Sequence, residues 1–260
     1  MKSVFAFGHG YSGTHLMTQI LKTIPNIDCD HERILPESPY ALFDKYVGVY
    51  KGDLDPFKEL GIQRKDFING IIKNGKIFGE VNCMLGYFVK ALDKMFNDSK
   101  FIFISRDPRT QIRTIYNTGG YNMSVFPDNF DPFWWPTPAK EDPSFEKWDK
   151  MKQLEKCSWA WNLYYDYILS ELGKIDKNKY FHIKFEDMVA GRKLPELFKF
   201  LGVPSPNAAQ IKKITSVKFA KTGTREKSPL PVWQAMNLQS HKIIRRYTKE
   251  TAKKLGYDII

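Results

Sequence analysis

The sequence has few cysteines and no long apolar run, and these absences exclude several classes of protein. Its 260 residues include three cysteines, Cys29, Cys83 and Cys157. An odd number at long spacings gives neither a disulfide framework nor a zinc-binding pattern, so buried reduced thiols are expected. No apolar stretch approaches the roughly 18 residues that a membrane span requires. We therefore expect a cytoplasmic protein that does not bind a membrane.

The charge balance is strongly basic. The 40 Lys and Arg residues outnumber the 29 Asp and Glu residues and give a formal net charge of +11. Such an excess favours an anionic partner, either a nucleic acid, a membrane surface or a small phosphorylated ligand. The basic residues are spread along the chain and form no nucleic-acid-binding motif, so no nucleic-acid partner is expected.

Short apolar runs alternate with segments of helical periodicity. The runs expected to be strands are 4–7, 76–80, 101–104 and 180–183. The segments expected to be helices are 14–24, 84–96, a helix beginning at Pro108, 148–172, 194–201 and 240–255. This alternation predicts a three-layer α/β/α fold with a central, mainly parallel sheet. The length and the 42% hydrophobic content suit one domain over residues 1–260.

A glycine-rich loop between the first predicted strand and helix is the sharpest local feature. It covers residues 8–15, GHGYSGTH. In such a loop consecutive backbone N–H groups can turn toward an anion, and the helix N-terminus adds a partial positive charge. The hydroxyls of Ser12 and Thr14 can also donate to a phosphate. The alternative is a turn that only joins strand to helix.

The loop differs from the Walker A pattern in the two residues that serve magnesium triphosphates. Gly8 and Gly13 have the Walker spacing, but Thr14 stands at the lysine position and His15 at the Ser/Thr position. A nucleotide or small-molecule kinase is therefore a less favoured alternative, and no metal is expected.

These residues resemble the first motif of the sulfotransferase superfamily, whose members use 3′-phosphoadenosine-5′-phosphosulfate (PAPS) and release PAP. Residues 11–16, YSGTHL, are similar to the family's loop ending in Ser-Gly-Thr. The resemblance implies a P-loop NTPase-like sulfotransferase fold. It also implies that the 5′-phosphosulfate end of PAPS is bound by Gly10, Tyr11, Ser12, Gly13, Thr14 and His15.

Two later stretches resemble the family's motifs for the 3′-phosphate. Residues 101–108, FIFISRDP, are similar to its strand followed by Arg-Asp-Pro, with Thr114 eight residues after Arg106. The resemblance implies that Arg106 and Thr114 bind the 3′-phosphate, and arginine offers a fork of donors that suits this group. Residues 221–225, KTGTR, resemble the closing basic loop. Further candidates there are Lys221, Gly223 and Arg225. The stretches 180–188 and 198–204 also match, in positions expected to be structural.

Sulfuryl transfer requires a base for the acceptor. Some carbohydrate and bacterial relatives place a Glu about twenty residues after the loop, and Glu32 stands at that distance. His31 is the alternative, since the pKa of a free imidazole suits proton transfer near neutrality. The family also places such residues after the strand that ends here at Glu80, so Glu80 and Asn82 are further candidates.

Tyr11 departs from the family's pattern. Relatives usually carry Lys or Arg immediately before Ser-Gly-Thr, where the cation bridges the sulfate and the leaving phosphate. The alternative sources of that cation are His9 or His15 in protonated form, Arg109 and Arg113. A weakly active or inactive PAP-binding protein is therefore the alternative to an active enzyme.

Residues 118–148, rich in proline and aromatic side chains, are too long for an ordinary connection. They are expected to cover the acceptor site, with Trp134 and Trp135 stacking on a sugar or lining an apolar slot. Alternatively these aromatics only anchor the segment to the core. The acceptor is expected to be a carbohydrate or another small molecule.

Overall fold

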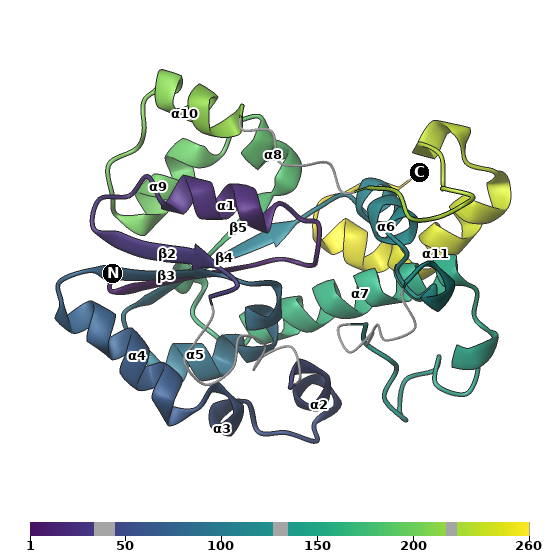
Figure 1. The fold of residues 1–260 in the computed structure, drawn as a ribbon, viewed down its shortest axis with the longest axis horizontal. Coiled ribbons are helices and arrows are strands. Elements are labelled where there is room, and N and C mark those ends of the chain that lie inside the picture. Colours follow the sequence, from purple (N-terminus) through teal and green to yellow (C-terminus); the bar gives the residue numbers. More distant parts are fainter. Residues whose placement is uncertain (34–44, 127–134, 217–222, 260) are drawn as a thin grey trace. The chain divides into compact units, whose positions relative to one another are not determined.

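The computed structural model describes residues 1–33, 45–126, 135–216 and 223–259 (Figure 1). The chain divides into two compact units. Unit 1 comprises Met1–Ser105 and Tyr167–Phe219, and unit 2 comprises Arg106–Asp166 and Ala220–Ile260.

Unit 1 is built on a five-stranded sheet. Its strands are β1 (Ser3–Phe7), β2 (Ile27–His31), β3 (Ile77–Val81), β4 (Ser99–Ser105) and β5 (Tyr180–Lys184). Their order is β2-β3-β1-β4-β5, and every pair is parallel. β1 occupies the centre, where Ala6 is paired with Val81 of β3 and with Ile102 of β4. The segment after β1 therefore leaves the sheet at its carboxyl edge, where open α/β sheets bind ligands.

Helices cover both faces of this sheet, which gives the predicted three-layer arrangement (Figure 1). On one face lie α1 (Thr14–Leu21), α8 (Phe185–Val189), α9 (Leu194–Leu201) and α10 (Ala208–Thr215). On the other face lie α4 (Ile62–Lys73) and α5 (Val89–Met95). Unit 1 also contains α2 (Tyr46–Lys51), α3 (Pro56–Leu60), and the 3-10 helices η1 (Cys83–Phe88) and η4 (Lys177–Lys179).

The apolar run in β1 is explained by burial on both faces of the strand. Val4 and Ala6 pack in one core cluster with α1 and α9 residues such as Met17 and Phe198. Phe5 points to the opposite face, since successive strand residues alternate. There its ring lies 5.8 Å from that of Phe78, 5.8 Å from that of Phe96 and 5.9 Å from that of Phe101. A strand buried on both faces is continuous in apolar residues rather than alternating.

Unit 2 is mainly helical. Its helices are α6 (Pro108–Asn117), α11 (Leu238–Lys254), and the 3-10 helices η2 (Met123–Val125), η3 (Trp148–Lys150) and η5 (Trp233–Ala235). The helix α7 (Gln153–Leu172) begins in unit 2 and ends in unit 1. α6 starts as predicted, because the side chain of Asp107 accepts the Arg109 N–H at 2.8 Å and Pro108 occupies the first turn.

Two segments that we expected to be single helices are divided. Residues 83–88 form η1 before α5, and the Asn82 side chain caps this segment by accepting the Met84 N–H at 2.9 Å. Residues 148–150 form η3, and Met151 is extended before α7 begins. In both places the apolar periodicity of the sequence indicated helical residues, but it did not indicate that a 3-10 helix precedes the α-helix.

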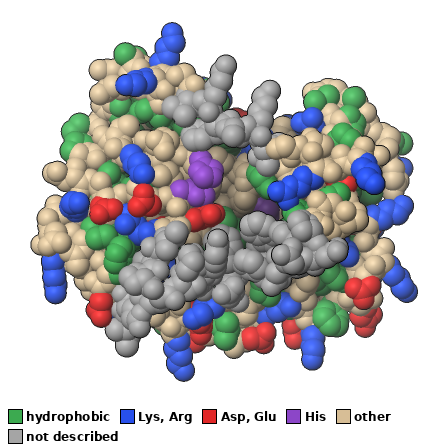
Figure 2. Space-filling view, viewed as in Figure 1, with side chains coloured by type: hydrophobic (Ala, Val, Ile, Leu, Met, Phe, Trp, Pro, Cys, Tyr) green, Lys and Arg blue, Asp and Glu red, His purple; other side chains and the backbone are tan. Residues whose placement is uncertain are grey.

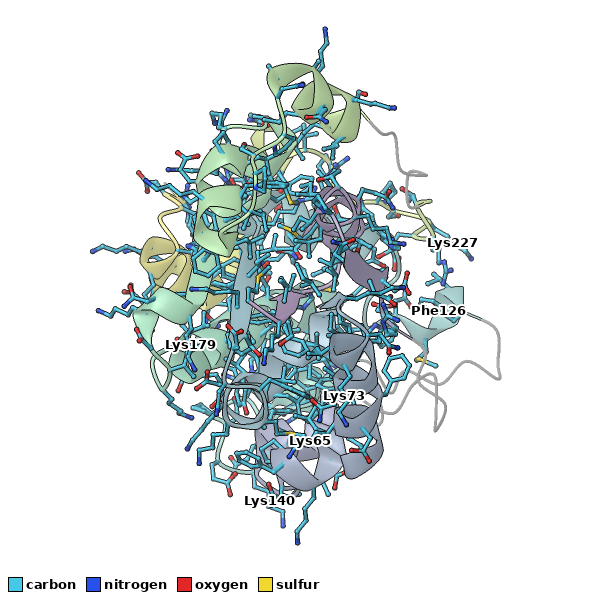
Figure 3. All side chains as sticks on the ribbon, turned by 90° about the vertical axis from the view of Figure 1, so that its left-hand side faces the viewer. Lys65, Lys73, Phe126, Lys140, Lys179 and Lys227 are labelled. Atoms are coloured by element: carbon cyan, nitrogen blue, oxygen red, sulfur yellow. The ribbon has the colours of Figure 1, made fainter. Side chains whose placement is uncertain are left out.

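Exposed lysines occur in both units. Lys65 and Lys73 lie in α4, whereas Lys140 and Lys227 belong to unit 2 (Figure 3). The basic excess is thus spread over several elements, as its distribution in the sequence indicated. Among the described helices, none combines the length and the apolarity that crossing a membrane demands.

Candidate functional site

The loop after β1 is a tight turn that leads directly into α1. The Ser12 N–H donates to the His9 carbonyl at 3.0 Å, and the Met17 N–H donates to the Gly13 carbonyl at 3.0 Å. Tyr11 lies in the left-handed region with φ of 66°, which is uncommon for a residue that has a side chain. Sparsely populated backbone conformations of this kind concentrate at ligand-binding sites.

Glycine is required at both ends of the loop. A Cβ at Gly8 would overlap Ser12 Oγ and lie 2.6 Å from the carbonyl oxygen of Ile104 in β4. Gly13 has φ of +95°, and a Cβ there would lie 2.6 Å from the Phe185 ring of α8. The loop is therefore held closely between the central sheet and the helix layer.

The two hydroxyls of the loop differ in their partners. Ser12 Oγ is buried and has no hydrogen-bond partner among the described residues. Thr14 Oγ1 lies 2.9 Å from His31 Nε2. A buried hydroxyl without a partner is costly, so Ser12 is a group that a bound anion would satisfy.

His31 and His15 stack on each other beside the start of α1. Their ring centroids are 3.8 Å apart and the planes differ by 17°. Burial, and next the neighbouring His15, lower the pKa of His31 to about 4. Burial likewise lowers the pKa of His9 to about 4. His9 and His31 are therefore neutral near neutral pH. Figure 2 shows histidine side chains gathered on one face with acidic side chains beside them.

Glu32 follows β2 and is the next residue after His31. Its Oε2 lies 3.8 Å from His31 Nδ1, and Cys83 Sγ lies 3.7 Å from its Oε1. Burial is the main cause that raises the pKa of Glu32, and Glu80 adds to it. Glu32 also has a positive φ of 45°. A half-buried carboxylate with a raised pKa is suited to accepting a proton.

Glu80 is held in an ion pair instead of facing solvent. Both of its oxygens lie 2.6 Å from Arg64 Nη2, and the two side chains are 0% and 5% exposed. Asn82 donates to Glu80 Oε1 at 3.4 Å. This arrangement favours a structural role for Glu80 over the catalytic role that we considered from the sequence. Arg64 was not among the predicted residues, because α4 has no motif that marks it.

In unit 2, Arg106 and Thr114 are both associated with α6. Arg106 Nε donates to Thr110 Oγ1 at 3.2 Å, and Thr114 Oγ1 donates to the Thr110 carbonyl at 2.9 Å. Thr110 thus contacts both residues that the family motif assigns to the 3′-phosphate.

The arginines suggested as substitutes for the loop cation have partners of their own. Arg109 forms an ion pair with Asp107, with Nη2 and Oδ2 at 2.6 Å. Arg113 Nε donates to the Leu230 carbonyl at 3.1 Å.

The segment that carries Gly223 and Arg225 is fixed to the end of α6 by Asn117. The Asn117 carbonyl accepts the Arg225 N–H at 2.8 Å. Its side chain accepts the Leu230 N–H at 2.7 Å and donates to the Leu230 carbonyl at 3.1 Å. The Arg225 guanidinium lies 4.6 Å from the Phe126 ring centroid. Asn117 was missed from the sequence because one asparagine at a helix end carries no motif; Lys221 lies outside the described residues.

The described aromatics near residues 118–148 pack on one another. The Tyr121 ring lies 5.3 Å from that of Trp135 and 5.5 Å from that of Trp148, and Trp148 lies 4.9 Å from Trp159. These contacts support an anchoring role for Trp135, whereas Trp134 lies outside the described residues.

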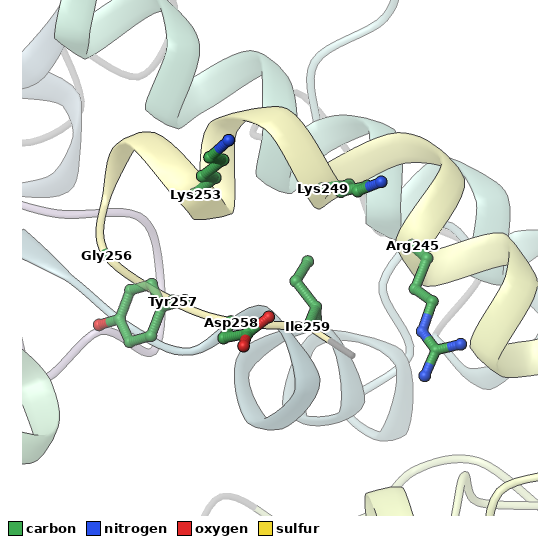
Figure 4. A pocket seen from close by; sticks show the side chains of 7 residues that line it. All are labelled: Arg245, Lys249, Lys253, Gly256, Tyr257, Asp258 and Ile259. Carbon is green, nitrogen blue, oxygen red and sulfur yellow. The ribbon is translucent and has the colours of Figure 1, made fainter.

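A hollow of about 660 Å³ in unit 2 lies between α11 and the segment 256–259 (Figure 4). Its lining residues are Arg245, Lys249, Lys253, Gly256, Tyr257, Asp258 and Ile259. None of the predicted site residues in the described part of the chain is among them.

Comparisons with known proteins support the fold and identify the family. A family profile described as Sulfotransferase family matches residues 3–207. No curated protein sequence gives a significant match. The sulfotransferase domain from the curacin biosynthetic pathway is 13% identical, with a TM-score of 0.56 over 98% of this chain and 97% of that one. The corresponding domain from the Synechococcus olefin synthase is 15% identical, with a TM-score of 0.56 over 98% and 94%.

A mouse sulfotransferase complexed with PAP is 15% identical, with a TM-score of 0.50 over 97% of this chain and 84% of that one. Identities this low show a shared fold only. The family profile spans well over half of the chain, however, and so the chain belongs to the Sulfotransferase family.

Proposed function

We propose that this protein transfers a sulfuryl group from PAPS to a hydroxyl or amine acceptor. The observation that carries the proposal is the loop after the central strand, in which Ser12 Oγ is buried without a partner among the described residues. The solved structure of a mouse family member contains PAP, the product that such a transfer leaves. The Ser12 hydroxyl and the backbone N–H groups at the start of α1 would donate hydrogen bonds to the oxygens of a bound phosphate.

The proposed roles extend the family's motifs to the matching residues of this chain. Residues 10–15 bind the 5′-phosphosulfate end through backbone N–H groups and hydroxyls. Arg106, Thr114 and Arg225 bind the 3′-phosphate, where charge-assisted hydrogen bonds from arginine are strongest. PAPS supplies the sulfuryl group when it is bound. The protein's task is to hold donor and acceptor in line and to remove the acceptor's proton.

Glu32 is the base that the geometry supports best. Its carboxylate takes the proton from the acceptor O–H or N–H as the acceptor's lone pair attacks sulfur. The bond between sulfur and the phosphate oxygen breaks, and its electron pair leaves with the phosphate. His31 is a poorer base than Glu32, since its Nε2 is occupied by Thr14 and its pKa is lowered to about 4.

Replacing Glu32 with glutamine is expected to reduce transfer by about 10²–10⁴-fold while PAP binding stays nearly unchanged. The amide keeps the size of the side chain but cannot take a proton. PAP formation from PAPS would be measured with pooled alcohols, sugars and amines as acceptors, and PAP affinity by calorimetry. The control is Asp30→Asn, since Asp30 lies two residues before Glu32, in β2, and is 49% exposed beside Lys22.

Equal rates for Glu32→Gln and the unmodified protein would remove Glu32 from the mechanism. If the unmodified protein binds PAP but no pool accepts the sulfuryl group, the second candidate function, a PAP-binding protein without efficient transfer, would replace the first. Tyr11, at the position of the usual cation, is the observation that favours this second candidate.

A further inference from the structure

The loop has no permanent cation of its own. Residues 8–16 contain no Lys or Arg. Lys22 and Arg33 flank the loop and β2 in sequence, but both have acidic partners. Lys22 Nζ lies 3.0 Å from Asp30, and Arg33 Nη2 lies 2.6 Å from Asp28. Charge that develops on a phosphate at this loop therefore needs another source of compensation.

We propose that the stacked pair His15–His31 supplies this charge by taking up one proton from solvent when a phosphate or phosphosulfate group binds to the loop. The inference rests on the proposed function, because it concerns the same donor site. It assigns to these imidazoles the role that Lys or Arg plays in relatives, which Tyr11 cannot perform.

The contacts of His31 explain how the pair would act on the ligand. His31 Nε2 lies 2.9 Å from Thr14 Oγ1, and the ring is fixed on one side by His15 at 3.8 Å. A neutral imidazole has one N–H, whereas an imidazolium donates from both nitrogens. Once protonated, His31 must donate through Nε2 to Thr14 Oγ1. The hydroxyl hydrogen of Thr14 is then free to point at a phosphate oxygen.

The groups around His31 act in opposite directions on its protonation. Glu32 Oε2, 3.8 Å from Nδ1, attracts a proton to His31. His15 opposes it, and two stacked imidazolium rings at 3.8 Å would repel each other. Cys83 and Glu80 act on Glu32, the carboxylate beside His31. Without a ligand, burial lowers the pKa of His31 to about 4, so the proton is absent near neutrality.

A bound phosphate changes this balance. An opposite charge within about 4–6 Å favours the charged form of a group and shifts its pKa by about 1–3 pH units, so an anion raises the pKa of an imidazole, and a phosphate dianion carries two charges. The pKa of His31 would then approach neutrality in the complex. Binding and protonation are reciprocal, so PAP affinity must rise as the pH falls through this range.

Calorimetric titration with PAP in two buffers of different ionisation enthalpy would count the protons taken up. At about pH 6 the unmodified protein is expected to take up about one proton more per PAP than His31→Gln, and the difference should vanish by about pH 8.5. Protons that PAP itself gains or releases contribute equally to both proteins, so they cancel in the difference between the unmodified protein and His31→Gln. His241→Gln is the matched control, because His241 belongs to unit 2 and stacks on Trp233 at 4.1 Å.

A second measurement covers the case in which His31→Gln folds poorly. Imidazole ¹⁵N spectra of the unmodified protein, assigned with His15→Gln, should show His31 as an imidazolium with PAP bound and as a neutral imidazole without it at about pH 6.5. PAP binding with no proton uptake and a neutral pair would overturn this inference alone. Absence of PAP binding would overturn the proposed function along with it.

Discussion

Replacing Arg64 with methionine is expected to lower the free energy of unfolding by about 3–5 kcal/mol, because it leaves a buried carboxylate without a partner. Glu80 has no exposed surface, and both of its oxygens lie 2.6 Å from Arg64 Nη2. Urea denaturation followed by fluorescence would measure the loss. The slope of the unfolding free energy against urea concentration should stay unchanged if the native state stays compact.

Two further variants make this expectation specific. The double variant Arg64→Met with Glu80→Met should recover most of the loss, since a matched apolar pair removes the unpaired charge. Arg192→Met should cost under about 1 kcal/mol, because Arg192 is 63% exposed where it pairs with Asp187. A double variant as unstable as Arg64→Met would show that lost packing, and not the buried charge, dominates. The expected loss on Arg64→Met also bears on function, because it would support a structural role for Glu80 in β3.

The substitution Gly8→Ala is expected to remove PAP binding and to lower stability by about 1–3 kcal/mol, the usual cost of overpacking. The added methyl would lie 2.6 Å from the Ile104 carbonyl oxygen, which belongs to a central strand and cannot move cheaply. The loop must therefore shift as a whole, and its N–H groups lose their common direction. Thermal denaturation and PAP calorimetry would measure the two effects.

Gly10→Ala is the control within the same loop. A Cβ at Gly10 would meet no atom within 4 Å, and Gly10 has no positive φ, so its stability should change by less than about 0.5 kcal/mol. If Gly8→Ala bound PAP as tightly as the unmodified protein, the loop's shape would not be what holds the ligand.

The fold was predictable wherever apolar patterning was strong. The strand 101–104 and the helix 194–201 have buried faces with clear periods, and the structure has β4 and α9 there. The edge strand β2, sequence IDCDH, was not predicted. Only Cys29 in it is buried, and charged residues between its apolar ones weaken the period-2 signal.

The site was predictable only through residues that belong to motifs. The loop at residues 8–15 and Arg106 belong to short motifs, whose residue types and spacing can be seen directly in the sequence. Other contacts join residues from separate elements. They are the Arg64–Glu80 ion pair, the hydrogen bonds of Asn117 to Leu230 and the stacking of His15 on His31. Nothing local marks them, because their pairing is created by the sheet order and by the packing of helices.

The central claim, that the loop and Arg106 bind PAP, is tested most directly by thermal denaturation with PAP and with magnesium-ATP at matched concentrations. A ligand that binds only the folded state, at a hundred times its Kd, stabilises by about 2.7 kcal/mol. For a chain of 260 residues this corresponds to a shift in Tm of a few degrees. We predict that PAP raises the Tm, that magnesium-ATP does not, and that Arg106→Ala abolishes the PAP effect. A larger shift with magnesium-ATP, or an unchanged PAP shift in Arg106→Ala, would contradict the account.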